Sequence, residues 1–88
     1  MTLTIKHFLS TATFYFLSGS AESFKDVKSA IHDIPVYELD KAVEELDLAI
    51  ERYSELANFS VQTKLYSDII KYINYWDNTL AIAQTKQL

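Results

Sequence analysis

The sequence contains no cysteine, one glycine and one proline in 88 residues. The absence of cysteine excludes disulfide bridges, thiolate zinc sites and thiol nucleophiles, so side-chain packing, within one chain or between subunits, must hold so short a chain together. One glycine and one proline are too few for the many tight turns of a β-sandwich or barrel, or for a glycine-rich phosphate loop. These absences favour an all-α protein.

Positive charge is also scarce, because eight lysine and arginine residues stand against twelve acidic residues, for a formal net charge of −4. We therefore expect no direct binding to nucleic acid or to a membrane. No apolar run reaches the roughly 18 residues of a membrane span, and the expected location is the cytoplasm. Residues 8–17, followed by Gly19 and Ala21, have the outline of a secretory signal, and secretion is the minority alternative.

The chain is nevertheless apolar, with 49% hydrophobic and 14% aromatic residues, which excludes intrinsic disorder. Breaks in the helical pattern fall at residues 18–20, 33–35 and 58–60. Gly19 suits a left-handed helix C-cap, Pro35 a first helical turn and Ser60 an N-cap. We predict helices over residues 4–18, 21–33, 36–58 and 61–84, with extended structure as an alternative for the threonine- and aromatic-rich first segment.

The third predicted helix has the clearest core-facing stripe. Its members are spaced three and four residues apart: Val36, Leu39, Val43, Leu46, Ile50, Tyr53 and Ala57. In the fourth, apolar residues cover about half the circumference, so that helix needs more than one neighbour. We predict a single all-α domain over residues 1–88, a small up-and-down bundle of three to four helices with a long C-terminal helical hairpin. A three-helix core with an extended arm is the alternative.

Acidic residues line the opposite side of the third predicted helix. They lie within about 80° at 100° per residue, and we term them the acidic ridge: Asp40, Glu44, Asp47, Glu51 and Glu55. A solvated helix face is one interpretation. A docking surface for a basic partner protein is the other, because like charges four residues apart repel unless an opposing surface compensates them. Calcium-loop spacing and the Glu-x-x-His pair of di-iron bundles are absent, so we expect no metal site.

The two histidines are His7 and His32. His32 lies near a predicted helix end, where a cation interacts favourably with the helix dipole. The run His7-Phe8-Leu9-Ser10-Thr11-Ala12 resembles the His-x-Leu-Lys-Gly-Ala run around the phosphorylated histidine of phosphotransfer bundles, over six residues and without the lysine and the glycine. An exposed histidine is the simpler interpretation of His7. Because no nucleophile, base and orienting group converge, we expect no catalytic residues, no cofactor and no enzyme.

Most aromatic residues fall on predicted core faces, but Phe14 and Tyr75 do not. With the half-apolar fourth helix, they indicate a contact surface for another chain. We therefore expect a non-enzymatic protein-binding module, an inhibitor, neutralising or adaptor protein, of the immunity, antitoxin or phage anti-defence type by analogy only. The acidic ridge, Phe14 and Tyr75 are its expected partner-binding residues, and a homodimer is expected. A structural self-associating subunit is the alternative, and a phosphotransfer or metal-binding bundle comes third.

Overall fold

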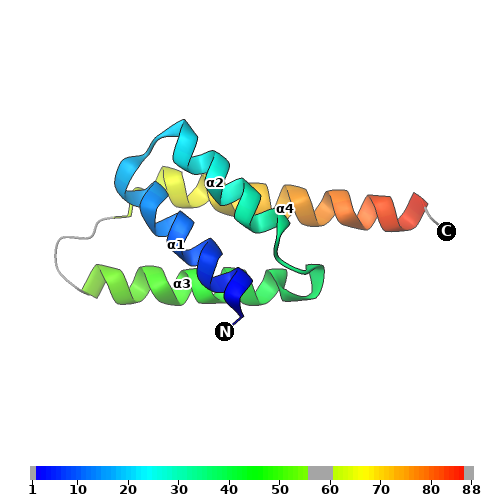
Figure 1. Cartoon of the computed structure of the whole chain (residues 1–88), viewed down its shortest axis with the longest axis horizontal. Helices are drawn as coiled ribbons and strands as arrows, with labels where there is room; N and C mark the ends of the chain where they lie inside the picture. The colour runs from blue at the N-terminus through cyan, green and yellow to red at the C-terminus, as the bar shows by residue number, and fades with distance from the viewer. Residues whose placement is uncertain (1, 56–60, 87–88) are drawn as a thin grey trace.

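The computed structural model describes residues 2–55 and 61–86, with side chains described as far as residue 83 (Figure 1). The described chain is helical: α1 (Leu3–Ser18), α2 (Ala21–His32), the 3-10 turn η1 (Val36–Glu38), α3 (Leu39–Glu55) and α4 (Thr63–Lys86). The predicted all-α bundle is confirmed, and helix is found over the first segment, where extended structure was the alternative. Residues 56–58 and the predicted N-cap Ser60 lie outside the described residues.

The turn between α1 and α2 is fixed by one glycine and a cluster of serines. Gly19 has a φ of 65°, and its N–H donates to the Tyr15 carbonyl at 2.7 Å, which confirms the left-handed cap. Ser20 caps α2 by accepting a hydrogen bond from the Ser23 N–H at 3.2 Å. The Ser23 side chain is buried, and its hydroxyl lies 2.7 Å from that of Ser18. This turn folds α2 back along α1 as an antiparallel pair (Figure 1).

The third helix does not begin directly after Pro35 as predicted. Pro35 has a φ of −56° but an extended ψ of 143°, and the next residues form the 3-10 turn η1, in which the Glu38 N–H donates to the Pro35 carbonyl at 2.8 Å. The α-helical hydrogen-bond pattern is established only from Leu39. Proline fixes its own φ but leaves its ψ free. Its position therefore predicts a break between helices but not whether the next turn is 3-10 or α-helical.

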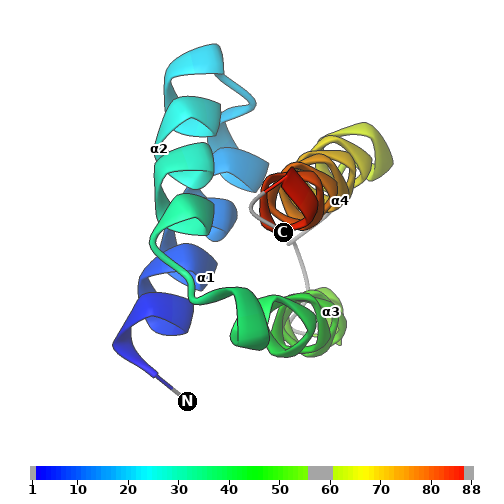
Figure 2. The ribbon, with the colours of Figure 1, turned by 90° about the vertical axis from the view of Figure 1, so that its right-hand side faces the viewer.

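The short helix α1 occupies the centre of the packing. It contacts each of the other three α-helices, and its contact with α2 is the most extensive in the molecule. Figure 2 shows α3 and α4 nearly end-on, with the α1–α2 pair on one side of both. The hairpin of α3 and α4 is antiparallel (Figure 1), but α1 bridges its two helices, whose direct packing is limited. The largest fully buried side chains come from all four helices: Ile5, Phe8, Val27, Ile31, Leu46 and Ile69.

The predicted stripe of α3 is buried along its middle and open at both ends. Its buried or partly buried members are Leu39, Val43, Leu46 and Ile50. Val36 is 44% exposed, because it lies in η1, where the 3-10 period breaks the α-helical spacing. Tyr53 is 37% exposed at the edge of the contact with α1. Ala57 lies outside the described residues.

The last helix contacts several neighbours, as its wide apolar surface predicted. Leu65, Ile69 and Ile73 are buried, and α4 contacts α1, α2 and α3. Its C-terminal part continues past the ends of the other helices (Figure 1), which lengthens the molecule to 50 × 26 × 19 Å. In the part of the chain that the structure describes, no helix combines the length and the apolarity needed to cross a bilayer.

Candidate functional site

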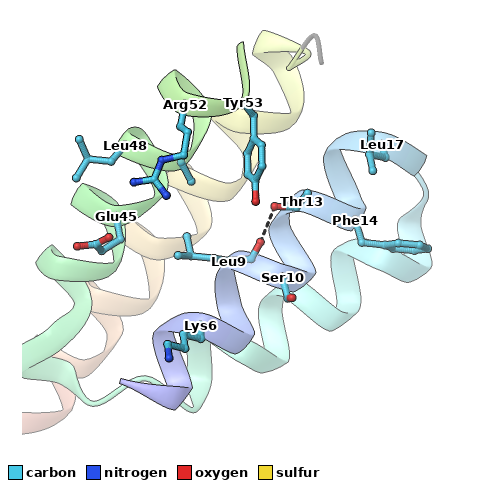
Figure 3. Close-up of a pocket in the computed structure, with 11 residues that line it drawn as sticks. Lys6, Leu9, Ser10, Thr13, Phe14, Leu17, Glu45, Leu48, Arg52 and Tyr53 are labelled. Atoms are coloured by element: carbon cyan, nitrogen blue, oxygen red, sulfur yellow. Dashed lines mark hydrogen bonds between the residues drawn. The ribbon is translucent and has the colours of Figure 1, made fainter. Parts of the chain in front are cut away.

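Exposed apolar side chains gather in a groove of about 500 Å³ between α1 and α3 (Figure 3). Phe14 and Leu17, from α1, are 61% and 69% exposed, and Leu48, from α3, is 47% exposed. Tyr53 points from α3 toward α1 across the groove. We term this feature the α1–α3 groove. It exists because α1 is apolar on two sides, so that the residues pointing away from the core form a second, uncovered apolar surface.

The polar and charged groups of the groove differ in their partners. The Thr13 hydroxyl donates to the Leu9 carbonyl of its own helix at 2.8 Å (Figure 3), so it is satisfied within α1. The Glu45 carboxylate lies 3.2 Å from the ammonium of Lys41. Two cations, Lys6 and Arg52, also line the groove and form no ion pair with the residues described here. The groove is therefore suited to covering an apolar surface, with cations at its margin.

The acidic ridge lies along α3, and all its members are exposed, but they differ in what they contact. Asp47 accepts a hydrogen bond through Oδ1 from the Tyr66 hydroxyl of α4. Burial, followed by this bond, raises the pKa of Tyr66 to about 12. Glu44 lies 3.9 Å from the Lys41 ammonium. Asp47 thus connects α3 to α4, a structural role that the spacing of the ridge did not predict.

Tyr75 lies apart from the α1–α3 groove. It is 64% exposed in a shallow hollow with Phe24, Asp68 and Lys71, and its ring centroid is 6.0 Å from that of Tyr72. Phe14 and Tyr75 were predicted to belong to one contact surface. The structure places both side chains in solvent, as expected, but they line different hollows on different helices.

An aromatic stack between α2 and α4 escaped the sequence prediction. The His32 ring stacks on Trp76 with centroids 4.1 Å apart, and its Nε2 is hydrogen-bonded to the Tyr72 hydroxyl at 2.7 Å. His32 does occupy the last turn of α2, as expected, but it also connects that helix to α4. The spacing of four residues between Tyr72 and Trp76 places them on one face, whereas their pairing with His32 depends on tertiary structure.

Two side chains could have revealed the groove in the sequence. Leu48 lies among charged residues on α3, and Leu17 lies on the side of α1 opposite its core. Neither residue belongs to the core stripe of its helix, and both are exposed. Their meeting could not be predicted, because it depends on how α1 crosses α3. His7 is exposed on α1, and no three histidine or acidic side chains of the described residues are grouped to hold a metal ion.

Comparison with protein-family models, with curated protein sequences and with solved structures gave no match for this chain.

Proposed function

We propose that this chain is a non-enzymatic protein-binding module that acts as an inhibitor, neutralising or adaptor protein. The observation that carries the proposal is the α1–α3 groove, where Phe14 and Leu17 on α1 and Leu48 on α3 stay exposed along its opposite margins (Figure 3). Contiguous apolar surface on a small protein marks interaction sites, because covering it removes water from both partners. Thr13 and Glu45 have partners within their own helices, and Lys6 and Arg52 lie at the margin, an arrangement that supports binding rather than bond-making chemistry.

The acidic ridge supports a partner with a basic surface. Glu44 and Glu51 are exposed on α3, the helix that also forms one wall of the groove. Exposed complementary charge acts mainly on the association rate, and salt screens it over about 10 Å at 0.1 M ionic strength. The groove would then supply the apolar contact that sets the lifetime of the complex, and the ridge would supply the attraction that brings the partner to it.

The test is affinity capture from the native host with matched variants. Phe14→Glu places a charge in the groove, whereas Tyr75→Glu makes the same change in the other hollow. We expect a partner to be retained by the parent and by Tyr75→Glu, and lost with Phe14→Glu. A partner that all three proteins retain equally, or none retained by any, would contradict the groove as a binding site for a host partner.

The ridge is tested on the same partner after purification. Reversing Glu44 and Glu51 together to lysine should slow association about tenfold at low salt and flatten its salt dependence, with little change in dissociation. An unchanged association rate and salt slope would assign the ridge to the solvated helix face instead.

A structural subunit that associates only with itself is the second candidate. It is favoured by α4, which extends past the bundle and carries Ile82 at 57% exposure. Light scattering coupled to gel filtration separates the candidates, because a strict monomer at high micromolar concentration would eliminate the structural subunit and leave the binding module.

A further inference from the structure

One face of α3 beside the groove carries charges in a self-complementary order. Its residues are spaced 3, 4, 4 and 3 apart and lie within about 80° of one another, and we term them the Leu48 face: Lys41, Glu44, Leu48, Arg52 and Glu55. All are exposed, Leu48 to 47%. Along the helix the order is positive, negative, apolar, positive, negative. In the opposite direction it is negative, positive, apolar, negative, positive, so every charge has the opposite sign.

An antiparallel twofold contact requires this property, because each charge of one copy must meet a charge of opposite sign on the other copy. If Leu48 of one copy lies against Leu48 of another, with the helices antiparallel, each position before 48 faces the position equally far after it. Glu44 then faces Arg52, and Lys41 faces Glu55. The twofold axis repeats each pair, so opposite charges surround the apolar centre. A parallel contact would instead place every residue against its own copy, with like charges together.

The ion pairs already present on this face are weak enough to be rearranged. Lys41 lies 3.2 Å from Glu45 and 3.9 Å from Glu44 in contacts within one helix, and the side chains of Lys41 and Glu44 are 52% and 63% exposed. Pairs between exposed side chains contribute little to stability, because solvent and salt screen them. Arg52 forms no ion pair with the described residues, and its planar guanidinium can bind a carboxylate through two hydrogen bonds.

The twofold arrangement also covers apolar surface in the groove. In an antiparallel pair, the twofold axis is perpendicular both to the helices and to the line that joins them. The two α1–α3 grooves therefore lie on the same side of the dimer, and Phe14 and Leu17 of both copies flank the contact. A standard interface buries about 800 Å² per partner, roughly 13% of the 5971 Å² surface of this chain. A single helix face is too small for this, so the edge of α1 must contribute. The remaining ridge residues Asp40, Asp47 and Glu51 fall on the other side.

We infer that the chain forms a twofold homodimer in which the Leu48 faces of two α3 helices pack antiparallel, with Glu44 of each copy against Arg52 of the other. The inference rests on the proposed function in one respect, since it takes the α1–α3 groove as a protein interface, and it names the occupant as a second copy of this chain.

The test is a charge exchange read by sedimentation velocity on the full chain. Glu44→Arg makes both positions of the central pair positive, and Arg52→Glu makes both negative, so each variant repels itself. We expect each alone to dimerise at least tenfold more weakly than the parent. When the two variants are mixed in equal amounts, residue 44 of each chain faces a residue 52 of opposite charge on the other variant. We therefore expect dimers that contain one chain of each variant.

Controls separate this contact from a loss of fold and from other interfaces. Asp26→Arg makes the same charge change at an exposed position on α2, outside the Leu48 face, the acidic ridge and the groove, and should leave the dimer intact. Circular dichroism must show unchanged helix content in each variant, and Leu48→Asp, at the centre of the contact, should give monomers if a charge variant misfolds. A monomeric parent at high micromolar concentration, or a mixture no more dimeric than its components, overturns the homodimer. Capture of a host partner by such a monomer would still support the proposed function.

Discussion

The Tyr66 hydroxyl donates a hydrogen bond to Oδ1 of Asp47, which joins α4 to α3 where these helices have little other contact. Tyr66→Phe removes the hydroxyl and keeps the ring. We expect it to lower the free energy of unfolding by about 1 kcal/mol at neutral pH, the usual net value of such a bond. Urea denaturation followed by circular dichroism measures the change. Tyr37→Phe, on a side chain that is 85% exposed, is the control and should have no effect.

The same bond makes stability depend on pH in the alkaline range. Burial and the bond to Asp47 raise the pKa of Tyr66 to about 12, above its ordinary value of 10.0. Above pH 10 the unfolded chain therefore loses this proton while the folded chain keeps it, and the stabilising contribution falls as the pH rises from 10 to 12. Between pH 9 and 11 the parent should lose more stability than Tyr66→Phe. Equal losses in both proteins would show that other groups cause the alkaline dependence.

Phe8 and Phe14 provide a matched pair on α1, one fully buried and one 61% exposed. Phe8→Leu shrinks a core side chain and should cost about 1 kcal/mol, whereas Phe14→Leu should change stability by less than about 0.5 kcal/mol. Thermal and urea denaturation measure both. A stability loss at Phe14 as large as that at Phe8 would mean that the groove is part of the core rather than a binding surface.

Gly19 holds its left-handed conformation with room for a side chain. A methyl group there would meet Leu65 Cδ1 at 3.9 Å, which is ordinary contact, so Gly19→Ala should be penalised by its φ of 65° alone. We expect a loss of about 1 kcal/mol. Gly19→Asn should lose less, because asparagine tolerates this conformation better. Equal losses from the two substitutions would point to crowding instead of backbone conformation.

The stack of His32 on Trp76 can be separated from the hydrogen bond of His32 to Tyr72. His32→Phe keeps an aromatic ring against Trp76 and removes the hydrogen bond, whereas His32→Ala removes both. We expect His32→Ala to destabilise the chain by about 1 kcal/mol more than His32→Phe. It should also shift the fluorescence of Trp76, the sole tryptophan, to longer wavelength. An identical spectrum in the parent and His32→Ala would exclude a stack in solution.

The sequence was sufficient for the features that depend on neighbours along the chain. The all-α fold and the left-handed Gly19 follow from spacing and local conformation, and the structure confirms them, whereas the 3-10 turn before α3 was not predicted. Exposure of the acidic ridge, Phe14 and Tyr75 also followed, because each falls opposite a core stripe.

What the sequence could not provide are contacts between residues far apart in it. Asp47 and Tyr66 are 19 residues apart, and His32 and Tyr72 are 40 apart. Polar and aromatic residues on two helices can pair in many registers, and only the packing of α1 against both α3 and α4 selects one. The groove is a similar case. From the sequence Phe14 is an isolated exposed residue, and only the crossing of α1 over α3 makes it line the same groove as Leu48.

The central position of α1 sets an order of events during synthesis. This helix leaves the ribosome before α2, α3 and α4, and its hairpin with α2 can close as soon as the tight turn at Gly19 is made, because local contacts form fastest. The apolar residues of α1 that face α4, however, stay uncovered until the last helix has been translated. We therefore expect a nascent chain that stalls before residue 63 to be a substrate for chaperones and proteases, and we expect synthesis of α4 to end that exposure.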